Sequence, residues 1–117
     1  MIAVIFEVML ENDEKKDRYL DIAAHLRPIL DTIDGFISIA RFASVSTPGK
    51  MLSLSFWRDE RAVQEWRSLE THRAAQHAGR SDVFQDYRLR VAAVMRDYGM
   101  HVRDEAPVDS RGWHESD

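Results

Sequence analysis

The order of hydrophobic patterns along the chain constrains its fold more than any other feature of the sequence. Residues 2–10 are almost all apolar, with Glu7 as the one charge inside the run, which is typical of a central strand. Residues 12–35 then place apolar side chains at the spacing of one buried helical face. The later patterns predict a strand over 36–45, a strand over 51–57, a helical stretch over 58–79 and a strand over 83–98.

This order of strand, helix, strand, strand, helix and strand is that of the split βαβ arrangement. It predicts an α+β, ferredoxin-like domain with an antiparallel sheet, which we assign to residues 1–100. Turn-forming residues at 46–50 join the second and third strands as a hairpin. Residues 101–117 are a polar segment with one large apolar residue, Trp113, and are expected to form a loose tail.

The ends of the two helices carry recognisable signals. Asn12 or Asp13 is expected to cap the first helix, and Asp34 with Gly35 to end it. Pro28 lies inside this helix, where it removes a backbone donor, so we expect a kink or a break there. Gly79 is the expected end of the second helical stretch.

The sheet has apolar residues on both faces, but two helices in a ferredoxin-like fold cover only one. The run from 2 to 6 and the two-sided final strand therefore need a second cover. A second copy of the chain, packed sheet against sheet, is the simplest one. We expect a homodimer that closes a shared barrel, with pockets between the sheet and the helices.

Composition excludes several classes of function. Sixteen Lys and Arg against twenty Asp and Glu give a formal charge of −4, which opposes binding of nucleic acid. The chain has no cysteine, so thiolate metal sites and cysteine nucleophiles are excluded. No apolar run approaches the roughly 20 residues that cross a bilayer, and the N-terminal run lacks the pattern of a signal peptide. We expect a cytoplasmic protein with no membrane partner.

Several short segments point to a family. They are Ser55-Phe56-Trp57-Arg58-Asp59-Glu60, Trp66, His72-Arg73-Ala74-Ala75-Gln76, Tyr87-Arg88-Leu89-Arg90-Val91 and Asp34-Gly35-Phe36. With these segments the chain resembles the antibiotic biosynthesis monooxygenase family from its first strand through Tyr98. The resemblance implies a dimeric α+β barrel. Some members oxidise aromatic, polyketide-like substrates with molecular oxygen and no metal or organic cofactor, whereas related members bind and degrade haem.

The haem-degrading relatives use a tryptophan on the helix after the third strand, a histidine about three turns further on as the iron ligand, and an asparagine on the first strand. Trp66 matches the tryptophan. At the spacing of the ligand the chain has Gln76, with His77 one residue later and His72 one turn earlier. The first strand offers Phe6 and Glu7 in place of the asparagine. These departures favour the cofactor-free members over the haem degraders.

Trp66 and His72 are the first two candidate catalytic residues. Trp66 belongs to an apolar helical stripe, so it is either core or the wall of a pocket, where its ring would stack on a flat substrate and its N–H would orient a polar group. His72 is either a surface residue or, facing the cavity, a general base. The spacing of His72 and His77 does not match a metal-binding pair. Trp57 ends a strand and is expected to serve packing or the dimer contact.

Glu7 and Arg90 are the other two candidates. An unpaired buried carboxylate is costly, so Glu7 must face water, a partner or a pocket. It either pairs with Arg41, Arg88 or Arg90 on a neighbouring strand, or acts as a base in the pocket. Arg90 and Tyr87 are expected on opposite faces of the last strand, where one of them would anchor a carbonyl or phenolate oxygen.

The resemblance thus implies a cofactor-independent monooxygenase with a small aromatic, polyketide-like or quinol substrate and molecular oxygen as its partners. A base such as His72 would remove a proton, and Trp66 or Arg90 would donate to the developing oxyanion. Two alternatives stay open. One is a non-catalytic dimeric module that binds a small ligand, and the other is a haem-binding or haem-degrading protein.

Overall fold

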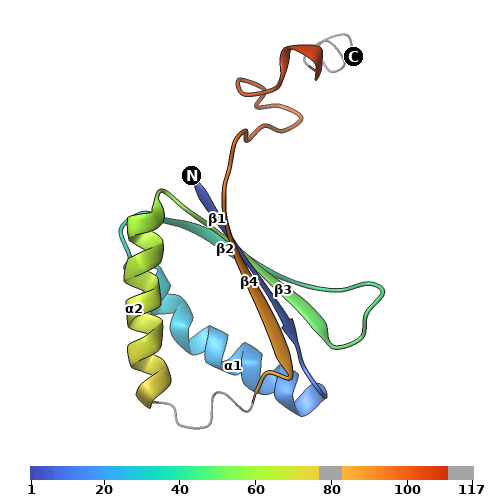
Figure 1. Ribbon diagram of the computed structural model, residues 1–117, viewed down its shortest axis with the longest axis vertical. Coiled ribbons are helices and arrows are strands. Elements are labelled where there is room, and N and C mark those ends of the chain that lie inside the picture. The colour runs from blue at the N-terminus through green and yellow to red at the C-terminus, as the bar shows by residue number, and fades with distance from the viewer. Residues whose placement is uncertain (77–82, 111–117) are drawn as a thin grey trace.

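The computed structural model describes residues 1–76 and 83–110 and, within the second helix, the side chains only as far as Leu69. Six elements follow one another in the predicted order. They are β1 (Ile2–Met9), α1 (Asp13–Leu30), β2 (Phe36–Ala43), β3 (Lys50–Trp57), α2 (Glu60–Gln76) and β4 (Asp86–Ala93). The strands form one open antiparallel sheet with both helices on the same side of it (Figure 1). The α+β, ferredoxin-like fold is therefore confirmed.

The sheet has the strand order β2-β3-β1-β4, so the nearly all-apolar β1 lies in its interior and β4 at one edge. In an antiparallel pair, residues directly opposite each other share a face. Val8 lies opposite Met51 and Tyr87, and it is buried against Tyr19 of α1. Even-numbered residues of β1 therefore point to the helix side, and odd-numbered ones to the side without helices, which we call the open face.

β3 carries apolar side chains on both of its faces, with Met51 and Trp57 buried on the helix side. Its helix-side residues include Ser53 and Ser55, which are both buried. Its open-face residues include Leu52, Leu54 and Phe56, which lie opposite Glu7, Ile5 and Ala3 of β1. Because large apolar side chains stabilise a fold by leaving water, this pattern indicates that the open face also belongs against another surface.

The first helix confirms its predicted cap and corrects its predicted end. The side-chain oxygen of Asn12 accepts a hydrogen bond from the Lys15 N–H at 2.9 Å. Pro28 causes no break, because α1 runs through it to Leu30. A proline this near the end of a helix removes a single intrahelical bond. The helix ends earlier than Asp34 because Thr32 and Ile33 donate to carbonyls only three residues back and tighten the chain into a turn.

The final strand is shorter than the sequence predicted. A strand over 83–98 was expected, but β4 covers Asp86–Ala93, and the last bond of its ladder joins the Val94 N–H to the Met1 carbonyl. The ladder with β1 ends at this bond, and alternation alone does not extend the strand. Residues 94–110, which we call the C-terminal arm, leave the sheet and end in a helical turn away from the domain (Figure 1).

The two helices cover the sheet unevenly. One buried cluster joins Val8, Leu10, Met51 and Val83 to Tyr19 of α1, and another joins Trp57 to Leu30, Ile33, Ala62 and Val63 at the start of α2. Every residue of β4 is exposed, including its helix-side residues. In the part of the chain that the structure describes, no helix is long and apolar enough to cross a membrane. The predicted end of the second helical stretch, Gly79, lies outside the described residues.

Candidate functional site

The start of α2 is held to the rest of the domain by a small group of charged residues. Asp59 caps the helix by accepting from the Ala62 N–H at 3.0 Å, and this bond, with the neighbouring Arg58, lowers the pKa of Asp59. Hydrogen bonds to Asp34 first and Asp59 second raise the pKa of Arg58. Arg58 thereby joins the cap to the turn after α1, at 3.2 Å from an Asp34 carboxylate oxygen.

Gly35 lets the turn after α1 lie directly against α2. Its φ is +95°, a region that favours glycine, and a side chain there would meet the Cβ of Ala62 at 2.9 Å. The turn after α1 and the first helical turn of α2 therefore pack with almost no space between them. Since Trp66 lies two turns beyond Asp59 on the same helix, this junction fixes where Trp66 meets the sheet.

Two tryptophans meet on the helix side of the sheet but differ in their surroundings. Trp57 is 1% exposed, and its indole N–H donates to the Ser55 hydroxyl at 2.9 Å. Trp66 is half-buried with its ring centroid 6.5 Å from that of Trp57. Within the described part of the chain, the indole N–H of Trp66 has no acceptor. Trp57 is thus a packing residue, which is one of the two roles that the sequence predicted for it. The indole N–H of Trp66, in contrast, has no acceptor among the described residues.

A row of aromatic rings crosses the helix side towards β4. Tyr19 touches Phe84, Phe84 touches Phe6, and Phe6 touches Tyr87, with centroids 5.6–5.7 Å apart in edge-to-face contacts. Tyr87 is 62% exposed, and its helix-side neighbours Leu89 and Val91 are exposed as well. This side of the sheet therefore presents an apolar, aromatic surface that the chain's own helices leave uncovered along β4.

Glu7 and Arg90 lie on the opposite face from Trp66. Glu7 pairs with Arg90 at 3.3 Å and with Lys50 at 3.8 Å, so the expected pairing with Arg90 is confirmed. Arg41 does not take part, because it lies on the helix side and donates to the Tyr19 hydroxyl at 3.3 Å. The sheet itself separates Glu7 and Arg90 from Trp66, so the four predicted site residues do not form one cluster within a chain.

The histidines give less information. His72 lies in α2, but its side chain is outside the described residues, as are His77 and His114. His25 contacts its own helix, with Nδ1 2.8 Å from the Asp21 carbonyl oxygen, and His101 is exposed in the C-terminal arm. In residues 1–69 and 83–110, no three His, Asp or Glu side chains come together in a way that could hold a metal ion.

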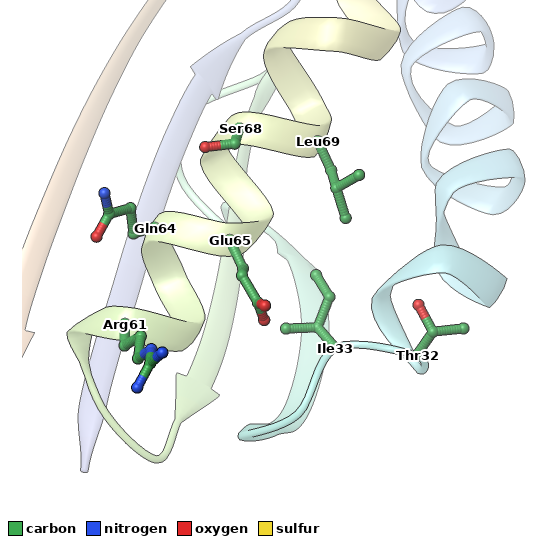
Figure 2. A pocket seen from close by; sticks show the side chains of 7 residues that line it. All are labelled: Thr32, Ile33, Arg61, Gln64, Glu65, Ser68 and Leu69. Atoms are coloured by element: carbon green, nitrogen blue, oxygen red, sulfur yellow. The ribbon is translucent and has the colours of Figure 1, made fainter.

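An open groove of about 510 Å³ lies on the outer side of α2 (Figure 2). Figure 2 shows Glu65 and Leu69 on the side of α2 nearer the turn after α1, with Gln64 and Ser68 on the other side. The groove is lined by Thr32, Ile33, Arg61, Gln64, Glu65, Ser68 and Leu69, none of which the sequence singled out. Arg61, Gln64, Glu65 and Ser68 have the spacing of an ordinary solvated helix face, and Leu69 belongs to the same apolar stripe as Trp66, so the sequence carried no signal for a groove. The expected pockets lay instead between helices and sheet.

Comparisons with known proteins agree on one family. Residues 1–78 match the family model described as antibiotic biosynthesis monooxygenase. A protein of Pyricularia oryzae named jasmonate monooxygenase ABM is 52% identical over 94 residues, which are 80% of this chain but 43% of that protein. The chain therefore spans less than half the length of this relative.

Two further relatives extend the comparison. The uncharacterized protein YqjZ of Bacillus subtilis is 33% identical over 99 residues, which cover 80% of this chain and 79% of that one. Among solved structures, the haem degrader MhuD of Mycobacterium tuberculosis, with two haems bound in its active site, superposes with a TM-score of 0.64. It is 19% identical over 85% of this chain and 100% of its own, a likeness that concerns the fold.

Proposed function

Because the chain belongs to the antibiotic biosynthesis monooxygenase family, we propose that it is a monooxygenase that oxidises a small, apolar substrate with molecular oxygen. The name of the 52% identical relative from Pyricularia oryzae supports the reaction type. The observation that carries the proposal is the state of Trp66: it is half-buried on the apolar helix side, and its indole N–H finds no acceptor among the described residues.

We place the substrate on the helix side of the sheet. Phe6 and Tyr87 offer ring edges and faces to a flat molecule, and Leu89 and Val91 extend the apolar surface along β4. Trp66 supplies a donor for a substrate oxygen. Glu7 and Arg90 are left out of this site because they face the other way and neutralise each other.

The chemistry of the proposal needs only a base and an oxyanion donor from the protein. A base removes a proton from an activated CH₂ group of an aromatic, polyketide-like substrate, and the carbanion reduces oxygen; from a quinol the base would remove an O–H proton instead. A carbon–oxygen bond forms, the CH₂ group becomes a carbonyl, and the second oxygen atom leaves as water, so the substrate itself supplies the electrons. His72 remains the predicted base, and Trp66 stabilises the developing oxyanion. A cytoplasmic location also stays a prediction of the sequence.

We further propose that the protein works as a homodimer joined through its open faces. β3 has apolar side chains on both faces, and its open-face residues Leu52, Leu54 and Phe56 support this arrangement. Phe42 of β2 lies opposite Leu52 on the same face and is 52% exposed. Burial of these side chains against a second copy removes apolar area from water on both copies at once.

Oxygen uptake tests the proposal with anthrone-like and hydroquinone substrates, and with jasmonate because of the relative's name. Trp66→Phe keeps an aromatic ring but removes the N–H, so kcat/KM should fall by about 100-fold while substrate binding persists. Trp66→Ala should abolish binding as well. Full activity in Trp66→Phe would remove Trp66 from the chemistry, and no uptake by the natural chain with any substrate would favour the non-catalytic binding module.

Haem is the second candidate, since MhuD shares the fold and Trp66 matches the tryptophan of the haem degraders. Titration of haem into the purified chain separates the two readings. We expect no saturable shift of the haem absorption band at micromolar concentration. A saturable shift that His72→Ala or His77→Ala removes would replace the cofactor-free reaction with haem chemistry.

A further inference from the structure

The C-terminal arm stands out from the domain. The chain has a radius of gyration of 17.1 Å, whereas a compact domain of this length has about 13 Å. Its longest dimension is 55 Å against 20 Å for the shortest. Figure 1 shows the reason, because the arm continues the direction of β4 past the end of the sheet and finishes far from both helices.

The end of the arm is nevertheless locally ordered by its own contacts. Arg103 donates to the carbonyls of Gly99 at 3.0 Å and Ser110 at 3.1 Å. Its guanidinium also lies over the ring of Tyr98 at 5.3 Å, and Ala106 is buried beneath these contacts. The sequence predicted a loose tail here. The arm instead carries a small closed unit, which can present a fixed surface.

The surface of the arm exposes large apolar side chains to water. Five large apolar side chains of the arm are between 43% and 85% exposed: Met95, Tyr98, Met100, Val102 and Val108. Contacts within the chain do not cover them, because the arm lies away from the domain. An exposed apolar segment of this kind is characteristic of a surface that binds another molecule.

Charge complementarity indicates what the arm binds. The arm holds four carboxylates, at Asp97, Asp104, Glu105 and Asp109, against Arg96 and Arg103. The open face of the sheet holds Lys50, Arg88 and Arg90 against the carboxylates of Glu7 and Asp86, which leaves one net positive charge. Arg88 is exposed and has no ion-pair partner in the described residues. The two surfaces therefore have opposite net charge, and both belong to this chain.

We propose that the C-terminal arm clasps a second copy of this chain, packing its apolar side chains against the partner's β4 edge with its carboxylates beside Arg88. The inference rests on the homodimer proposed above. In a two-fold dimer each arm makes the same contact, so the clasp forms twice. The open faces supply one part of the interface, and the arms extend it around the edge of each sheet.

Mixed dimers test the position of the arm directly. Because the chain has no cysteine, His101→Cys carries a single spin label at the tip of the arm. This spin-labelled chain is mixed with a second chain that is enriched in nitrogen-15 and carries no spin label. We expect broadening of the amide signals of β4 around Arg88 in the unlabelled chain, and none when the label is placed by Asp17→Cys on α1. Signals around Arg88 that stay sharp in the nitrogen-15 chain of the mixed dimers would overturn the clasp.

A second experiment separates this inference from the dimer itself. Met100→Glu combined with Val102→Glu should raise the dimer dissociation constant at least about tenfold, as measured by sedimentation. Leu20→Glu, on α1, is the matched control and should leave it unchanged. If the dissociation constant is the same for the arm variant and the natural chain, the clasp is wrong and the dimer stands. If the natural chain sediments only as a monomer, both proposals fail together.

Discussion

The two faces of the sheet solve the same problem in different ways. On the helix side, the chain buries its own residues, and Trp57 and Val8 are each 1% exposed. On the open face, Leu52, Leu54 and Phe56 lie opposite Glu7, Ile5 and Ala3 of β1, and neither helix lies on that side of the sheet (Figure 1). Residues one position apart on β3 thus face either the chain's own core or the surface that we propose for assembly. The difference shows that the role of a side chain in β3 depends on which of the two faces its alternating position in the strand gives it.

Trp57→Ala gives the largest expected effect and tests the helix side of the sheet, which the chain buries with its own residues. Trp57 packs against Phe36, Trp66 and the start of α2, and its loss leaves a cavity and an unpaired Ser55 hydroxyl. The free energy of unfolding should fall by about 3–5 kcal/mol, as measured by urea denaturation at one protein concentration. Phe42→Ala on the open face is the matched control. An equal loss in both variants would abolish the distinction between the faces.

Leu54→Glu gives the next largest effect and tests the open face. Leu54 lies in the middle of β3, between Ile5 and Ala40, where a dimer would bury the new carboxylate. The dimer dissociation constant should rise by about 30-fold or more, while circular dichroism stays that of the natural chain. Gln64→Glu adds the same charge on the outer side of α2 and should change neither. Dimers that survive Leu54→Glu unchanged would place the interface elsewhere.

Sequence reasoning recovered what local patterns determine and missed what pairing determines. The order of elements followed from hydrophobic periodicity, and the Asn12 cap from the residue types at the helix start. The face of the sheet on which Glu7 lies could not be predicted. In a strand that is apolar at nearly every position, the sequence does not show which alternate residues point to the helices. Pairing with β3 decides it, and β3 itself carries apolar residues on both of its faces. Candidate site residues therefore divided between two faces.

The length of β4 shows the same limit from another direction. Alternation continued to Tyr98 in the sequence, but a strand needs a partner for each residue, and the ladder with β1 ends at Val94. The residues beyond it became the C-terminal arm. A single sequence contains no direct record of where a partner strand stops, so this boundary required the structure.

The smallest expected effect concerns how the helix side holds α2, and therefore Trp66, at low pH. In the folded chain the pKa of Asp59 is lowered, first by the Ala62 N–H and then by Arg58. A carboxyl whose folded pKa is below its unfolded value stabilises the fold above the unfolded pKa, and that contribution is lost as pH falls through the folded pKa.

Asp59→Asn keeps an oxygen for the cap but cannot ionise, so the natural chain should be the more stable of the two near pH 6. The difference in the free energy of unfolding should shrink as the pH is lowered below about 4, where the carboxylate of the natural chain takes up its proton. Asp17→Asn, on the exposed side of α1, is the control for simple removal of a charge. Because Asp59 lies on the helix side, the dissociation constant of the dimer should not follow this pH dependence. If it did, the two faces would be coupled through the sheet, and the assignment of Trp66 to one and of assembly to the other would have to be given up.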